Sequence, residues 1–215
     1  MTDLTWWLIG ATVLLAVCDW IAVGLGRRTM ELVFKPATMV PLIGAALVLD
    51  PYSDANRMWF VAGLVLSLLG DILLMFDDDE RMFVGGLASF LLGHLVYIAG
   101  LAAAGVSGGA LLVGAVLVAV LVVVVAPRLV GAAKRTDPAL GLPVLAYTLA
   151  ISVMVAFAVG STVALAIIGA SLFYLSDFTI GWSRFEREFP GHRLVIITTY
   201  HAAQVFLVLS LTVAR

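Results

Sequence analysis

Long apolar runs constrain this chain more than any other feature of its sequence. A helix needs about 20 mostly apolar residues to cross the core of a membrane, and eight stretches approach that length. The composition agrees, since 63% of the residues are hydrophobic and 12% are charged, against roughly half and a quarter in soluble domains. We therefore predict an all-α, polytopic membrane protein with one transmembrane domain over residues 1–215. The predicted spans are 4–24, 36–49, 59–76, 83–104, 110–126, 140–160, 161–182 and 194–214.

Basic residues fall unevenly on the two sides that these spans define. Cytoplasmic loops are enriched in Lys and Arg. With the N-terminus outside, only Arg57 and Arg215 remain on the outer side. The inner side then carries Arg27, Arg28, Lys35, Arg81, Arg128, Lys134, Arg135, Arg184, Arg187 and Arg193. We therefore expect both termini to be extracytoplasmic in a protein of the cell membrane.

The start of the chain and its single cysteine exclude several other readings. Asp3 stands where a signal peptide would have positive charge, and the first apolar run is long enough to span, so we predict a membrane helix there. Cys18 alone can form neither an internal disulfide nor a cysteine-built metal site. The net charge of −2 and the lack of a basic tract give no indication of nucleic-acid binding.

One spacing suggests an internal duplication. Four residues recur at an offset of 106 positions: Asp71, Arg81, Phe83 and Gly85 match Asp177, Arg187, Phe189 and Gly191. This pattern favours two four-helix repeats. Chance coincidence in so biased a composition is the alternative.

Polar side chains inside the spans gather toward the inner side. A carboxylate in a membrane helix costs roughly 2.5 to 3.5 kcal/mol unless it faces protein, water or a partner. At 1.5 Å per residue, His94 and Tyr97 lie near the midplane. The inner third holds Asp19, Lys35, Asp71, Asp177, Tyr200, His201 and Gln204. This distribution predicts a polar pocket open to the cytoplasmic leaflet, with Lys35 at the start of its helix as the counter-charge.

The two aspartates Asp71 and Asp177 favour acid–base chemistry in that pocket. Two carboxylates in one low-dielectric site cannot both ionise cheaply, so one is expected to hold a proton near neutrality. Simpler roles compete with this one. Asp71 and His94 could be interhelical hydrogen-bond latches, Lys35 could reach lipid headgroups, and Asp19 is expected to be solvated near the inner surface.

The order of these residues along the chain resembles a known family. The residues concerned are Lys35-Pro36, Gly70-Asp71, Phe83, Gly86, Phe90, His94, Tyr97, Tyr147, Phe173, Ser176-Asp177, Tyr200 and Gln204. Together they resemble the YhhN family of lysoplasmalogenases over nearly the whole chain. The resemblance implies hydrolysis of the vinyl ether bond of lysoplasmalogens, which releases a fatty aldehyde and a glycerophospho-ethanolamine or -choline, without a metal or other cofactor.

The resemblance also implies a division of roles. Asp71 and Asp177 would be the catalytic pair, and Lys35 would hold one carboxylate ionised or bind the substrate phosphate. The other expected substrate-binding residues are His94, Tyr97, Tyr147, Tyr200, His201 and Gln204. The expected partners are a lysophospholipid substrate and membrane lipids.

Two other classes of function compete with this hypothesis. A zinc-dependent amidase of the ceramidase type needs several intramembrane histidines, whereas only His94 and His201 lie within predicted spans and His192 lies in a loop. A transporter for a small solute would also use repeats and buried carboxylates. Against it, no span is clearly broken, and the polar groups lie toward one side instead of the midplane.

Overall fold

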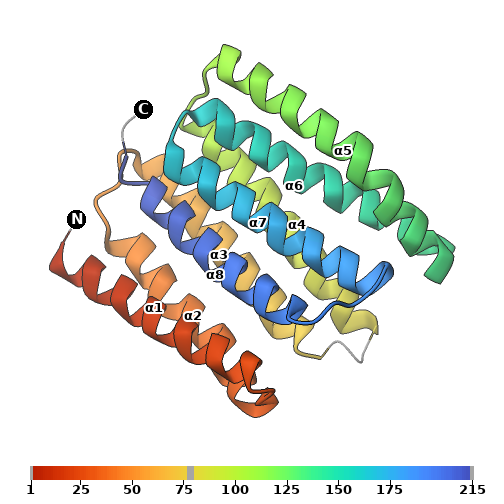
Figure 1. The fold of residues 1–215 in the computed structure, drawn as a ribbon. Coiled ribbons are helices and arrows are strands. Elements are labelled where there is room, and N and C mark those ends of the chain that lie inside the picture. The colour runs from red at the N-terminus through yellow and green to blue at the C-terminus, as the bar shows by residue number, and fades with distance from the viewer. Residues whose placement is uncertain (1, 77–79, 214–215) are drawn as a thin grey trace.

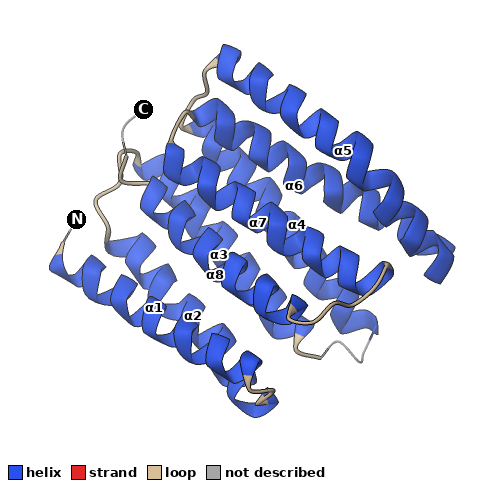
Figure 2. Cartoon of the chain, viewed as in Figure 1, coloured by secondary structure: helices blue, strands red, loops and turns tan. Residues whose placement is uncertain are grey.

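Eight α-helices make up almost all of the computed structural model, which describes residues 2–76 and 80–213 (Figures 1 and 2). A 3₁₀ turn, η1 (Pro138–Leu140), precedes the sixth helix. The helices are α1 (Asp3–Gly24), α2 (Arg28–Val48), α3 (Asp54–Leu74), α4 (Glu80–Ala103), α5 (Gly108–Thr136), α6 (Gly141–Ser161), α7 (Ala164–Phe185) and α8 (His192–Ser210). Each is long and apolar enough to cross a membrane. The predicted all-α fold with eight spans is confirmed. The expected charged connection over residues 77–79 and the end of the last span at residue 214 lie outside the described residues.

The helices run side by side, and both ends of the chain lie at the same end of the bundle (Figure 1). We call this the terminal end. The other is the basic end, since it holds the connections that carry Arg27 and Arg187 and the first turn of α8 with Arg193. The side of the membrane that each end faces stays a prediction.

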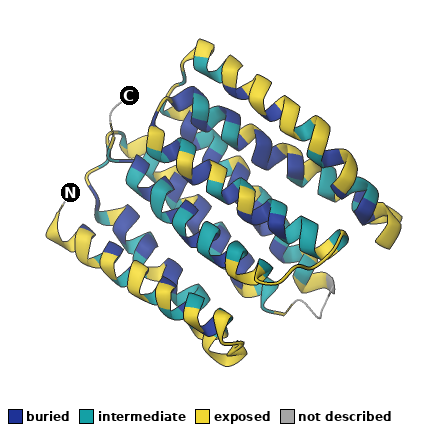
Figure 3. Ribbon diagram, viewed as in Figure 1, coloured by how far each residue is buried: buried dark blue, intermediate teal, exposed yellow. Residues whose placement is uncertain are grey.

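The helices pack in two layers, and four hairpins connect them: α1–α2, α3–α4, α5–α6 and α7–α8. One layer runs α1, α8, α7, α5 and the other runs α2, α3, α4, α6, and neighbours within each order are in contact. In Figure 3 the buried residues concentrate toward the middle of the bundle, whereas α5 is largely exposed along its length. The space between the layers is therefore where polar side chains are shielded from lipid. The internal repeat stays a prediction.

Two helices differ from the predicted spans. α2 begins at Arg28, eight residues before the predicted start at 36, and keeps both Pro36 and Pro41 in its interior. Proline is favoured at the first helical position, which is why Pro36 suggested a start, but membrane helices tolerate internal proline when neighbouring groups satisfy the freed backbone. α5 likewise continues past residue 126 to Thr136. Lys35 therefore lies inside a helix and not at its mouth.

Glycines on α3 let α4 pack closely against it. A Cβ atom on Gly63 would lie 2.7 Å from the Tyr97 ring, and one on Gly70 would lie 2.6 Å from the Phe90 ring. Small residues at helix interfaces are the usual means of such close approach in membranes. This packing fixes the position of α3 in the turn that leads to the buried carboxylate of Asp71.

Candidate active site between the helix layers

Asp71 lies at the centre of a contact among three helices. Its side chain is 1% exposed, and the Lys35 Nζ atom on α2 lies 3.2 Å from Oδ1. The Tyr200 hydroxyl on α8 donates a hydrogen bond of 2.5 Å to Oδ2. A buried carboxylate is tolerated when it is paired and hydrogen-bonded in this way.

Asp177 forms a second polar group with the next helices of the bundle. The Tyr147 hydroxyl on α6 donates a hydrogen bond of 2.9 Å to Oδ2 of Asp177. His94 Nε2 on α4 lies 3.3 Å from the same oxygen, and the His94 side chain is completely buried. The structure thus gives each predicted catalytic aspartate its own tyrosine and its own nitrogen base.

Aromatic rings fill the space between the two groups. Phe173 on α7 lies at the middle, with its ring centroid 5.5 Å from that of Tyr200 and 4.8 Å from that of His94. Phe90 packs edge-on against both Phe173 and Tyr200. The two carboxylates are therefore neighbours across an aromatic cluster, and the described contacts do not join them directly.

Asp177 also borders a recess that opens at the side of the bundle. Tyr147 and Asp177 lie in its wall. The remaining lining residues come from α5, α6 and α7 and are Val125, Leu129, Thr148, Ile151, Tyr174 and Phe178. The walls of this recess are mainly apolar, with the Asp177 carboxylate and the Tyr147 hydroxyl among its few polar groups.

The other predicted binding residues lie on α8 or face it, in separate contacts. The Tyr97 hydroxyl donates a 2.7 Å hydrogen bond to Gln204 Oε1, one turn beyond Tyr200 on α8. His201 faces α1, where Trp20 Nε1 donates to its Nδ1 at 3.2 Å. Among the described residues, these hydrogen bonds connect neither pair directly to an aspartate. The structure therefore places Lys35 and Tyr200 at Asp71, His94 and Tyr147 at Asp177, and the remaining three residues beside the site.

Asp19 is a buried carboxylate whose surroundings the sequence did not reveal. We expected it to be solvated, but it is 0% exposed, so that expectation is wrong. Neither of its carboxylate oxygens has a hydrogen-bond partner within the part of the chain that the structure describes. The nearest strong opposite charge is that of Lys35. Its burial follows from the face of α1 it occupies, since Thr12 and Ala16 precede it at helical spacing and are also buried.

Glu31 is the other acidic residue that sequence reasoning missed. It lies on α2 with a side chain only 12% exposed, between Arg28 and Arg193. Because α2 was expected to start at residue 36, Glu31 was placed outside the spans. Its spacing to Lys35 becomes informative only once the helix is known to begin at Arg28.

No metal-ligand set is visible within residues 2–76 and 80–213, where no three His, Cys, Asp or Glu side chains lie close enough to hold an ion. His94 and His201, the two histidines that the zinc-amidase alternative would use, contact different helices: His94 meets Asp177 of α7, and His201 meets Trp20 of α1. The described residues thus offer no candidate site for that alternative.

Eight helices that are each able to span a membrane and that enclose the buried carboxylates of Asp71 and Asp177 define a polytopic integral membrane protein. A model of the YhhN family matches residues 30–211. The chain therefore belongs to the YhhN family, as its resemblance indicated.

Named relatives support the same assignment. The chain is 32% identical over 171 residues to "Lysoplasmalogenase TMEM86B" of Homo sapiens. The aligned residues make up 79% of this chain and 70% of the human protein. The chain is 33% identical over 193 residues to "Lysoplasmalogenase" of Mycobacterium tuberculosis, with shares of 85% and 70%. "Uncharacterized membrane protein YhhN" of Escherichia coli is 29% identical over 205 residues, or 92% of this chain and 97% of that one. No solved structure matches the chain.

Proposed function

We propose that this protein hydrolyses the vinyl ether bond of lysoplasmalogens, giving a fatty aldehyde and a glycerophospho-ethanolamine or -choline. Relatives that carry the name lysoplasmalogenase, at 32% and 33% identity, support this class of activity. The observation that carries the proposal is the pair of buried aspartates, Asp71 and Asp177, on either side of one aromatic cluster.

The reaction has simple requirements. Protonation of the β-carbon of the vinyl ether gives an oxocarbenium ion, water adds to its cationic carbon, and the hemiacetal breaks down to an aldehyde and the glycerol hydroxyl. One water is consumed, and the proton returns to the enzyme. The site must supply a proton donor, stabilise a transient positive charge and position a water molecule.

Asp177 and His94 are our candidates for proton transfer. The two side chains lie 3.3 Å apart and can share a proton, while Tyr147 fixes the carboxylate by a hydrogen bond. Asp177 borders the lateral recess, through which an alkenyl chain would reach it from the bilayer. The recess thus supports an approach of the vinyl ether to this carboxylate first.

Asp71 is our candidate for stabilising the developing cation. Lys35 lies 3.2 Å away and offsets part of the cost of ionising this buried carboxylate, since an opposite charge at contact distance stabilises the charged form. The rings of Phe173 and Tyr200 lie between the two aspartates, and the face of an aromatic ring attracts a cation by roughly 0.5 to 2 kcal/mol. An oxocarbenium ion formed beside Phe173 would be stabilised by both.

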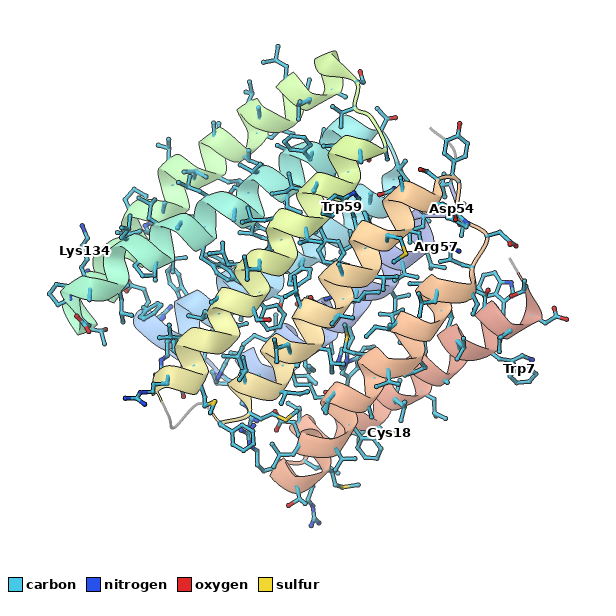
Figure 4. The ribbon with its side chains drawn as sticks, turned by 180° about the vertical axis from the view of Figure 1, so that it is seen from behind. Trp7, Cys18, Asp54, Arg57, Trp59 and Lys134 are labelled. Atoms are coloured by element: carbon cyan, nitrogen blue, oxygen red, sulfur yellow. The ribbon has the colours of Figure 1, made fainter. Side chains whose placement is uncertain are left out.

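Detection of released aldehyde from a 1-alkenyl lysophospholipid tests the proposal. We expect Asp71→Asn and Asp177→Asn each to lower turnover by orders of magnitude. The matched control is Asp54→Asn, because Asp54 is 81% exposed and pairs with Arg57 at the terminal end (Figure 4). Near-normal turnover in either buried variant would remove that residue from the mechanism, and no aldehyde from the unmodified protein would refute the activity.

A further inference from the structure

Two arginines converge on one carboxylate at the basic end of the bundle. Arg193 Nη2 on α8 lies 2.6 Å from Glu31 Oε2, and Arg28 Nη1 on α2 lies 3.3 Å from Glu31 Oε1. Arg28 Nη2 also donates to the carbonyl of Met75 at the end of α3. The side chain of Glu31 is 12% exposed, whereas those of Arg28 and Arg193 are 45% and 47% exposed. The Glu31 carboxylate is thus held between two guanidinium groups that are each about half exposed.

This arginine pair meets α2 at Glu31, about one helical turn from the Lys35–Asp71 contact, on the side of the basic end. Arg28, Glu31 and Lys35 are spaced three and four residues apart, so they share one face of α2. Glu31 and Lys35 are one turn apart, a rise of about 6 Å at 1.5 Å per residue. In the lysolipid, the glycerol backbone carries a phosphate at one end and the vinyl ether at the other. The distance between these two groups is comparable to the separation of Glu31 and Lys35.

We propose that Arg28 and Arg193 bind the phosphodiester group of the lysolipid, and that Glu31 occupies this anion site when no substrate is bound. The proposal rests on the proposed function and deepens it by locating the headgroup. Arginine suits this role because its planar guanidinium group matches the oxygens of phosphate as well as those of a carboxylate. Because both arginines are about half exposed, solvent weakens their attraction to Glu31.

Kinetics with two substrates test the assignment. The substrates are 1-alkenyl-glycerophosphocholine and 1-alkenylglycerol, which carries the same vinyl ether without phosphate. We expect Arg193→Gln and Arg28→Gln to raise the ratio of the phosphate-substrate KM to the alkenylglycerol KM by about tenfold, which corresponds to about 1.4 kcal/mol. Arg193→Lys should recover part of the loss. The control is Arg135→Gln, because Arg135 pairs with Glu186 at 3.0 Å on the same end of the bundle, and its ratio should not change.

Glu31→Gln separates an internal competitor from a structural ion pair. If Glu31 competes with the phosphate, its removal should lower the KM for the phosphate substrate several-fold. If Glu31 only orders the two arginines, the same change should raise that KM, and this result would overturn the proposal. The test does not depend on the arginine variants being stable.

A binding measurement keeps this proposal distinct from the proposed reaction. A 1-O-alkyl lysophosphocholine has no vinyl bond, so its Kd in detergent solution reports headgroup binding alone. We expect a Kd about tenfold weaker in Arg193→Gln and stronger in Glu31→Gln, even if no vinyl ether were cleaved. Unchanged lysolipid binding in the arginine variants would overturn the proposal. The second measurement is the binding of inorganic phosphate to the same variants. If the arginine variants weaken the binding of phosphate and not that of the lysolipid, the site binds free phosphate and the lipid assignment is wrong.

Discussion

Removing Lys35 should destabilise the protein more than removing its partner Asp71, although both changes break the same contact. Lys35→Met leaves a carboxylate that is 1% exposed with Tyr200 as its hydrogen-bond partner. Breaking a buried ion pair by removal of one partner typically costs about 3 to 5 kcal/mol. Since the Lys35 side chain is 18% exposed and the pair is partly reached by solvent, we take the lower limit of about 3 kcal/mol as the expected loss.

Asp71→Asn should lower the stability less than Lys35→Met does, because the Lys35 side chain is 18% exposed and its charge can still reach solvent. Its ammonium group can shift toward Glu31, one turn away on α2, or toward the basic end. The amide introduced by this substitution would still accept the Tyr200 hydrogen bond, so we expect a loss of about 1 kcal/mol. The double variant leaves no unpaired charge at the contact and should lose about 1 kcal/mol or less, which corresponds to a coupling of at least about 3 kcal/mol between the two residues.

Reversible unfolding in mixed detergent micelles gives these free energies for the four proteins of the cycle. Lys134→Met is the control, since Lys134 is exposed on α5 at the edge of the bundle, and it should change stability by less than about 0.5 kcal/mol (Figure 4). Two results would refute the idea that the buried ion pair allows Asp71 to lie between the layers. One is an equal loss of unfolding free energy in the two single variants. The other is a double variant whose loss equals the sum of the two single losses.

Two further changes test the packing and the hydrogen bond at Asp71. Tyr200→Phe should lower turnover by about tenfold or more in steady-state assays, because a hydrogen bond to a charged group contributes roughly 1.5 to 3 kcal/mol, whereas Tyr52→Phe at a 69% exposed position should not. Unchanged turnover in Tyr200→Phe would exclude this bond from the mechanism. Gly70→Ala should destabilise by about 1 to 3 kcal/mol in thermal unfolding, because its Cβ atom would lie 2.6 Å from the Phe90 ring. Gly10→Ala has nothing within 4 Å and serves as the control, and equal effects of the two would contradict the close α3–α4 packing.

The number and order of the helices could be predicted because each span has its own local signal. Apolar length marks a membrane helix, and the alternation of basic residues between the ends supports the same count. The start of α2 could not be predicted in this way. Pro36 is favoured at a helix start but is tolerated inside α2, where tertiary packing overrides the local preference.

The site was accessible to sequence reasoning in part. A carboxylate within an apolar run points to a shielded position whatever its partner, so Asp71 and Asp177 could be selected from the sequence. Their partners could not be assigned, because the choice of Tyr200 for Asp71 and of Tyr147 for Asp177 depends on which helices are neighbours. Asp19 shows the limit of an argument from depth, since its burial depends on the face of α1 it occupies.

Isotope labelling tests the proposed chemistry most directly. In D₂O, an enzyme acid that exchanges with solvent carries deuterium. Transfer of this deuterium to the β-carbon must place one deuterium at carbon 2 of the fatty aldehyde. The aldehyde is reduced at once to the alcohol to prevent further exchange, and the deuterium content is then measured by mass spectrometry. We predict one deuterium per aldehyde from the unmodified protein, with formation of the labelled product greatly slowed in Asp177→Asn. Aldehyde without deuterium at carbon 2 would contradict acid-catalysed cleavage of the vinyl ether.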